Sequence, residues 1–159
     1  MRDGSFALDG ATLTPAAVAA IARDGARVQL APEARARNDA ARTAIARLLA
    51  GGEHIYGVST GVGALRGHRV AEEDREGYSL RLLRSHACGA GRPLATELVR
   101  AAMATRANQI GAGGAGVADE LLEALVNALN ADLVVHARAR LAGHRRPHRA
   151  GRYRPGTPR

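Results

Sequence analysis

The chain has 159 residues and a formal net charge of +8, and all 23 of its Lys and Arg side chains are arginine. Residues 1–135 contain all 15 acidic residues and 15 arginines, whereas residues 136–159 contain eight arginines and no acid. Because the excess charge is confined to the C-terminal segment, the sequence excludes a uniformly basic nucleic-acid-binding protein.

The hydrophobic side chains are mostly small. They make up 46% of the chain, but 35 of them are alanine and four are aromatic. Since apolar burial contributes about 25 cal/mol per Å², we expect one thinly packed domain that needs surface from partner subunits or further chain. The single cysteine excludes an internal disulfide framework and fits a reducing, cytoplasmic compartment. The absence of an 18-residue apolar run and of a signal-like N-terminus disfavours membrane spanning and secretion.

In chain order, the first predicted elements are a strand, a helix and a second strand. Residues 5–10 read as a short strand that ends in an Asp-Gly turn. Thr14 and Pro15 offer an N-cap and a first helical position for a helix that ends near Arg23. Residues 27–30 favour another strand.

A longer helix is predicted over residues 32–50, with Gly51 and Gly52 as its stop. Five apolar side chains are expected to form its buried side. They are Ala36, Ala40, Ile45, Leu48 and Leu49.

The next segment, residues 53–68, is rich in glycine and lacks helical spacing, which indicates a shaped loop. Helical spacing then returns in three segments. These are residues 72–86, 94–110 and 117–130. The fold class is therefore predicted as mainly α with a small α+β N-terminal part. Residues 136–159, rich in Arg, His and Pro, have the composition of a disordered tail.

Three patterns that resemble functional sites have simpler interpretations. Gly111, Gly113 and Gly116 match a dinucleotide-binding spacing, but a predicted helix precedes them, which favours a helix end and a turn. Ser85 and His86 are neighbours on a helix, where side chains point about 100° apart, so we expect no nucleophile–base pair. Cys88 is expected to be a small buried side chain. We expect no metal site, because the tail histidines stand among arginines.

Tyr56 is the candidate that the loop itself suggests. It stands in a glycine-rich segment and is followed by the hydroxyls of Ser59 and Thr60. A phenol, whose ordinary pKa is about 10, acts as a base only where positive charge or hydrogen-bond donors assist it. A packing role for Tyr56 is the alternative.

Three segments together resemble the aromatic amino acid ammonia-lyase family, and its histidine ammonia-lyase branch most closely. They read Tyr-Gly-Val-Ser-Thr-Gly-Val-Gly at residues 56–63, Leu-Leu-Arg-Ser-His-Ala-Cys-Gly at residues 82–89, and Arg-Ala-Asn-Gln-Ile-Gly-Ala-Gly-Gly-Ala-Gly-Val at residues 106–117. The resemblance covers about residues 5–135. It implies the N-terminal region of that fold, truncated before the central helical bundle.

By this resemblance Tyr56 is the catalytic base that removes a proton from the substrate β-carbon, Gly63 lies beside the substrate, and His86 faces the substrate side chain. A histidine at this position resembles lyases that act on L-histidine or L-tyrosine. Four departures from the family pattern bear on the substrate. They are Val62, Ser79, Arg81 and Ala115.

The family's electrophile, a methylidene-imidazolone group, forms from an Ala-Ser-Gly segment that occurs nowhere in this chain. The basic residues 136–159 stand where that segment is expected. We interpret them as an out-of-frame translation of GC-rich DNA, and we expect the chain alone to be inactive and to be a doubtful partner in the family's homotetramer. The alternative is a small helical module that binds nucleic acid or another polyanion weakly and unspecifically through the arginine-rich tail.

Overall fold

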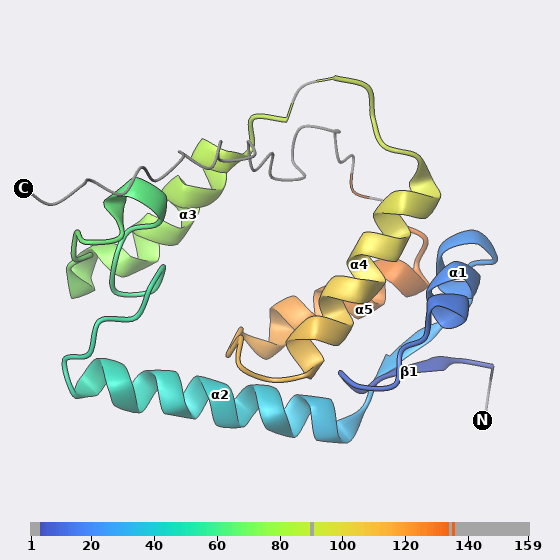
Figure 1. The fold of residues 1–159 in the computed structure, drawn as a ribbon, viewed down its shortest axis with the longest axis horizontal. Helices are drawn as coiled ribbons and strands as arrows, with labels where there is room; N and C mark the ends of the chain where they lie inside the picture. The colour runs from blue at the N-terminus through green and yellow to red at the C-terminus, as the bar shows by residue number, and fades with distance from the viewer. Residues whose placement is uncertain (1–3, 90, 134, 136–159) are drawn as a thin grey trace, which may run out of the picture.

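The protein is mainly helical, as predicted, in the computed structural model, which describes residues 4–89, 91–133 and 135 (Figure 1). Both the interpretation of residues 136–159 as a disordered tail and the tail-based alternative function lie outside the described residues. Within the described part, no helix has the length and apolarity that crossing a membrane requires. The elements in chain order are β1 (Phe6–Leu8), α1 (Pro15–Arg23), β2 (Val28–Leu30), α2 (Pro32–Ala50), the 3-10 turns η1 (Gly63–Leu65) and η2 (Glu72–Asp74), α3 (Arg75–His86), α4 (Thr96–Gly111) and α5 (Asp119–Asn130).

The N-terminal part is a strand–helix–strand unit. β1 and β2 pair in parallel, with Phe6 opposite Val28 and Leu8 opposite Leu30. Parallel neighbours require a crossover connection, and α1 supplies it. The predicted start of α1 is confirmed, because the Thr14 side chain accepts a hydrogen bond from the backbone N of Ala17 at 3.2 Å.

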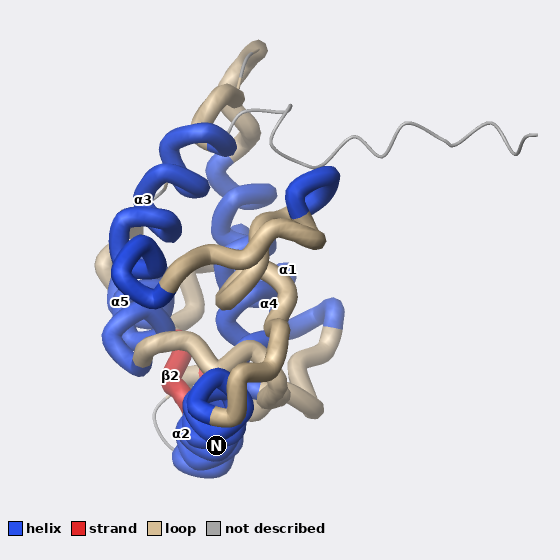
Figure 2. Tube along the Cα trace, turned by 90° about the vertical axis from the view of Figure 1, so that its left-hand side faces the viewer, coloured by secondary structure: helices blue, strands red, loops and turns tan. Residues whose placement is uncertain are grey.

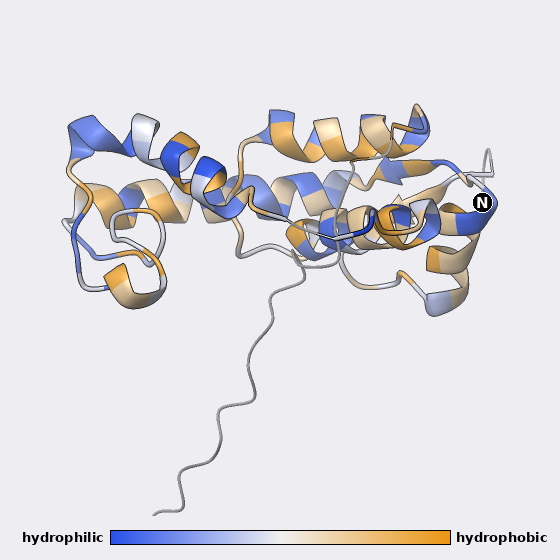
Figure 3. Cartoon of the chain, turned by 90° about the horizontal axis from the view of Figure 1, so that it is seen from above, coloured by the Kyte–Doolittle hydropathy of each residue, from blue (hydrophilic) through white to orange (hydrophobic). Residues whose placement is uncertain are grey.

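The hydrophobic core gathers around α4. This helix packs against α1, α2 and α5, and its buried side chains meet those of the small sheet. Figure 2 distinguishes the helices, the short strand β2 and the connecting loops, and Figure 3 shows that the helices carry alternating hydrophobic and hydrophilic segments. The largest fully buried apolar side chains are leucine and isoleucine, with alanines filling the closer contacts. They are Leu8, Ile21, Leu122 and Leu129.

The predicted buried side of α2 is wrong at three positions. Ala36, Ala40 and Leu48 are exposed, whereas Ala34 and Asn38 are buried. The other two predicted positions, Ile45 and Leu49, are partly buried.

The reason is a polar contact between α2 and the glycine-rich turn after α4. Asn38 Nδ2 donates to the carbonyl oxygen of Val117 at 2.8 Å, and Asn38 Oδ1 accepts from the backbone N of Val117 at 3.1 Å. A Cβ on Gly116 would lie 3.1 Å from the backbone N of Arg42 and 3.2 Å from the backbone C of Ala41, so glycine lets the turn approach the helix closely. The orientation of α2 therefore follows an amide pairing and a close backbone approach, which apolar periodicity does not reveal.

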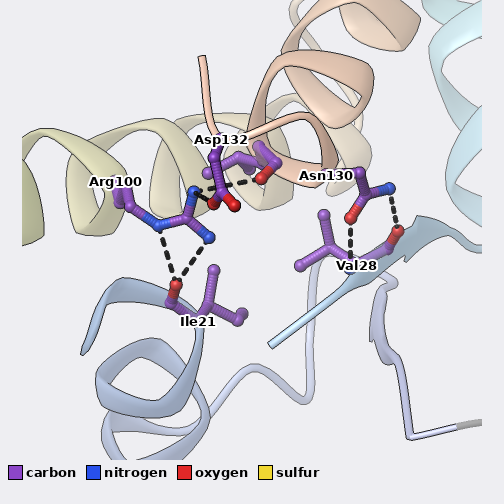
Figure 4. Close-up of polar contacts among 6 residues, drawn as sticks. Ile21, Val28, Arg100, Asn130 and Asp132 are labelled. Carbon is purple, nitrogen blue, oxygen red and sulfur yellow. Dashed lines mark hydrogen bonds and ion pairs between the residues drawn. The ribbon is translucent and has the colours of Figure 1, made fainter. Parts of the chain in front are cut away.

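Arg100 on α4 is a buried cation that joins two helix ends (Figure 4). Its side chain is 4% exposed. Nε and Nη2 donate to the carbonyl oxygen of Ile21 at 3.0 and 2.9 Å, and Nη1 donates to the carbonyl oxygen of Leu129 at 3.0 Å. Both carbonyls lie in the last turns of α1 and α5, where intrahelical donors are missing and the helix dipole favours positive charge. Nη1 also contacts Asp132 Oδ1 at 2.7 Å, but that carboxylate side chain is 80% exposed.

Asn130, at the end of α5, completes the edge of the sheet. Its Oδ1 accepts from the backbone N of Val28 at 2.9 Å, and its Nδ2 donates to the carbonyl oxygen of Val28 at 2.8 Å (Figure 4). The side-chain amide thus takes the place of a neighbouring strand at one residue of β2.

Replacing Arg100 tests whether this buried cation holds the helix ends together. Arg100→Met retains the side-chain length but leaves the carbonyl of Ile21 without its side-chain donor and that of Leu129 with only backbone donors from its own turn, such as the N of Asp132 at 3.4 Å. An unsatisfied buried group costs about 1–3 kcal/mol. We expect the free energy of unfolding in urea to fall by about 3 kcal/mol. The control Asp132→Asn removes only the exposed partner and should cost less than about 1 kcal/mol. Equal losses in the two variants would contradict the assignment.

Asp9 provides a pH-dependent test of the turn after β1. Its carboxylate accepts from Thr12 Oγ1 at 2.6 Å and from the backbone N of Thr12 and Ala11 at 2.8 Å each. The Thr12 side chain, followed by these backbone donors, lowers the pKa of Asp9 to about 2. Because the folded-state pKa lies below the unfolded value of 3.8, the stabilisation is complete above that value and is lost as the pH falls towards 2. Carboxyl NMR titration should give this pKa, and Asp9→Asn should remove this part of the pH dependence of unfolding.

Candidate functional site

The loop between α2 and α3 is held by the two buried hydroxyls that follow Tyr56. Ser59 Oγ accepts from the backbone N of Ile55 at 2.8 Å and donates to the carbonyl oxygen of Glu53 at 3.2 Å. Thr60 Oγ1 donates to the carbonyl oxygen of Gly61 at 3.0 Å. Both side chains therefore shape the loop backbone.

The second half of the loop closes on the first. The backbone N of Gly61 donates to the carbonyl oxygen of His68, and that of Val70 donates to the carbonyl oxygen of Ser59, each at 2.9 Å. A Cβ on Gly61 would lie 2.5 Å from the carbonyl oxygen of Leu65. The short turn η1 can therefore fold over the loop only because residue 61 is glycine.

Tyr56 is largely exposed, with 64% of its surface accessible. Its hydroxyl oxygen accepts a hydrogen bond from the backbone N of Gly63 at 3.1 Å. Gly63 has φ +58°, a conformation that glycine adopts without strain. The loop thus fixes the phenol oxygen against its own backbone.

A pocket of about 920 Å³ lies between this loop and α3. The structure brings Tyr56, Gly63 and His86 together in its wall, and these are the three site residues that the sequence predicts. Their roles stay predictions. The other residues in the wall are Val62, Ala64, Leu65, Tyr78, Arg81, Leu82, Leu83 and Ser85.

Ser85 and His86 do meet, so the expectation that they point apart is wrong. Ser85 Oγ lies 3.0 Å from His86 Nδ1. Each also lies within hydrogen-bond distance of the carbonyl oxygen of Leu82, at 2.8 Å for Ser85 Oγ and 2.9 Å for His86 Nδ1. The shared acceptor brings the two side chains together. In the tautomer in which Nδ1 carries the proton, Nδ1 donates to this carbonyl and Nε2 is the ring nitrogen that accepts.

Cys88 is exposed, which contradicts the expectation of a buried side chain. It lies two residues after His86, the last residue of α3, and its backbone N donates to the carbonyl oxygen of His86 at 2.8 Å in a tight turn. The turn lies beyond the helix, outside the core cluster around α4. The small size of a side chain therefore does not decide its burial here.

Sequence reasoning missed Tyr78 and Leu82 as pocket residues. Their spacing was a usable signal, because positions 78, 82 and 85 fall on one face of a helix with the predicted His86 beside them. The predicted glycine-rich stop after α4 is confirmed, since α4 ends at Gly111 and Gly113 has φ +97°.

The comparisons with known proteins agree on one family. The aromatic amino acid lyase model matches residues 13–140. The probable histidine ammonia-lyase of Halobacterium salinarum is 43% identical over 130 residues, which are 82% of this chain and 25% of that protein. The histidine ammonia-lyase of Symbiobacterium thermophilum is 43% identical over 78% of this chain and 24% of that protein.

The fold is similar to solved structures of the same group. The histidine ammonia-lyase of Trypanosoma cruzi gives a TM-score of 0.70 at 32% identity, over 80% of this chain and 25% of that one. The tyrosine aminomutase of Streptomyces globisporus gives 0.75 at 32% identity, over 79% and 24%. The chain spans about a quarter of the length of these proteins.

Gly61→Ala tests the close approach that shapes the loop. The added methyl group overlaps the Leu65 backbone, so we expect the backbone N–H groups of Gly63 and Val70 to lose protection from hydrogen exchange. Overpacking of this kind costs about 1–3 kcal/mol. The control Gly67→Ala meets no atom within 4 Å and should leave exchange unchanged. Equal protection in the two variants would contradict the described loop.

Proposed function

The chain belongs to the aromatic amino acid lyase family, and we propose that it forms the tyrosine-loop part of a histidine ammonia-lyase. The substrate class of this proposal is L-histidine, with L-tyrosine as the second candidate. The observation that carries it is the meeting of Tyr56, Gly63 and His86 in one pocket. The names of the relatives from Halobacterium and Symbiobacterium support the choice of histidine.

In this proposal Tyr56 places its phenol oxygen at the substrate β-carbon, the position from which a complete lyase would remove a proton. The hydrogen bond from the backbone N of Gly63 supports this role in two ways. It fixes the direction of the phenol oxygen, and it becomes a stronger, charge-assisted bond when that oxygen is negative. Since Tyr56 and Gly63 both line the pocket, a bound substrate reaches the phenol without a movement of the loop.

His86 would select the substrate ring. In the tautomer whose Nδ1 donates to the carbonyl oxygen of Leu82, Nε2 can accept from a ligand in the pocket. The imidazole N–H of histidine and the phenol O–H of tyrosine are both suitable donors, whereas phenylalanine leaves Nε2 without a partner. A site built to pair with a polar group disfavours the analogue that lacks it.

The residues of this chain do not fit the formation of the family's methylidene-imidazolone electrophile. Its four serines are Ser5, Ser59, Ser79 and Ser85, and none stands between alanine and glycine. Ser59 is moreover buried in hydrogen bonds that hold the loop. We therefore route no step through that group and propose that the chain binds its substrate without turning it over.

Exposed leucines support a place in a larger assembly. On α3, Leu80 is 49% exposed, and Leu83, in the wall of the pocket that we assign to the substrate, is 69% exposed. Relatives about three times as long have further chain with which to cover such side chains. The comparisons give no support to the nucleic-acid alternative.

Substrate binding and turnover can be measured separately. With L-histidine we expect shifts of the Gly63 amide and the His86 ring in NMR spectra, and no urocanate by ultraviolet absorbance. His86→Leu should abolish the Gly63 shift, whereas the control His54→Leu, outside the pocket, should retain it. Urocanate release would contradict the proposed inactivity. Unchanged spectra would contradict the substrate pocket.

A further inference from the structure

Two turns of the N-terminal unit have the same Asp-Gly sequence but different surroundings. They are Asp9-Gly10, after β1, and Asp24-Gly25, after α1. An Asp-Gly sequence is chemically reactive, because glycine has no side chain to shield its backbone nitrogen from the neighbouring carboxyl group. A third such sequence, Asp3-Gly4, begins outside the described residues. The two described turns show how the fold controls one reaction at two places.

The Asp9-Gly10 turn is held on both sides of its peptide bond. Thr12 donates to the Asp9 carboxylate through its side chain and its backbone N, and the side chain is the main cause that lowers the pKa of Asp9 to about 2. The carboxylate therefore stays ionised near neutral pH and is a poor electrophile. The backbone N of Gly10 donates to Asn108 Oδ1 at 2.8 Å, and a Cβ on Gly10 would overlap the backbone of Ala112. The nitrogen is thus engaged, and the peptide has no room to rotate.

The Asp24-Gly25 turn lacks these restraints, and both of its residues are exposed. Within the described part of the chain, the Asp24 carboxylate has no hydrogen bond or ion pair, and the backbone N of Gly25 donates to no acceptor. Gly25 has φ +67°, and a Cβ built on it would meet no atom within 4 Å, so that side of the turn is open. The nucleophile and the electrophile are therefore both accessible.

We propose that Asp24-Gly25 is a modification site at which aspartate isomerises spontaneously to isoaspartate. The backbone nitrogen of Gly25 attacks Cγ of Asp24, and an N–Cγ bond forms. The nitrogen's proton and the carboxyl OH leave as water, which produces a succinimide. Water then adds to either ring carbonyl. Breaking the N–Cγ bond restores aspartate, whereas breaking the original peptide bond gives isoaspartate. One water leaves and one enters, so the reaction needs no oxidant or other reactant.

Isoaspartate alters the connection between α1 and β2. The main chain then runs through Cβ and Cγ of residue 24, and a carboxylate sits on Cα, beside the last carbonyls of α1, where the helix dipole disfavours negative charge. Two hydrogen bonds follow this point. The backbone N of Ala26 donates to the carbonyl oxygen of Ala20 at 3.2 Å, and that of Phe6 donates to the carbonyl oxygen of Arg27 at 2.8 Å. We expect the longer main chain to weaken both.

The test incubates the full 159-residue chain near neutral pH in heavy-oxygen water. Samples are then digested with endoproteinase Asp-N, which cleaves before aspartate but not before isoaspartate, so each Asp-Gly sequence is read at its own cleavage site. Uncleaved, heavy-oxygen-labelled peptide at Asp24 should accumulate at least about tenfold faster than at Asp9, because releasing one charge-assisted hydrogen bond at Asp9 lowers the reactive population by that factor. In urea the two rates should become similar. Equal rates in the folded chain, or no conversion at Asp24, would overturn the proposal.

Two substitutions test the cause of the difference. Asp24→Glu retains the charge at an exposed position, but its longer side chain closes a ring much more slowly, so the peptide should take up no heavy oxygen there. Thr12→Val retains the shape of Thr12 and removes its side-chain bond to Asp9, which should accelerate conversion at Asp9 about three- to tenfold. Continued uptake in the first variant, or an unchanged Asp9 rate in the second, would contradict the mechanism.

Hydrogen exchange on the incubated chain tests the effect on the fold. In the isoaspartate fraction, the amides of Ala26 and Phe6 should lose protection, whereas the amide of Gly10, bonded to Asn108, should keep it. Unchanged protection at Ala26 would contradict the expected loosening of the turn. Neither Asp24 nor Gly25 lines the pocket that we assign to the substrate, so these outcomes do not depend on the proposed function.

Discussion

The buried guanidinium of Arg100 is the constraint on which the arrangement of the core depends. A core rich in alanine offers little apolar area per residue, so each directional contact inside it carries more weight. Arg100 lies on the central helix α4 and satisfies the C-terminal carbonyls of α1 and α5 at once. The end of α5 then places Asn130 against β2. One cation therefore sets the relation between two helices and, through them, the edge of the sheet.

The helices could be predicted because residues next to their ends determine where they begin and end. Thr14 and Pro15 begin α1, and Gly51 follows α2. The buried side of each helix could not be predicted, because it depends on contacts between residues that are distant in the sequence. Asn38 meets Val117 and Asn130 meets Val28, and neither pairing leaves a periodic trace in the sequence. An asparagine in the middle of a helix reads as solvent-facing until its partner is known.

In the candidate site too, some residues could be predicted from the sequence and others only from the structure. Resemblance to a family identified Tyr56, Gly63 and His86, and the structure brings them to one pocket. It could not identify Tyr78 as part of the pocket wall. The buried Tyr78 hydroxyl has no hydrogen-bond partner among the described residues, a feature that only a three-dimensional structure reveals. The short distance between Ser85 and His86 likewise arises from their shared acceptor, the Leu82 carbonyl.

The helix α2 connects the core to the loop that carries Tyr56, and α3 lies apart from α4 and α5 in Figure 1. Nineteen residues of helix span about 28 Å. Over this length, a bend of about 5° at one end of α2 moves its other end by roughly 2 Å. A displacement of about 1 Å can lower the rate of a catalytic site about a hundredfold. The described core therefore fixes the position of the tyrosine only approximately. A precise orientation of the tyrosine therefore requires contacts on the exposed, leucine-bearing side of α3.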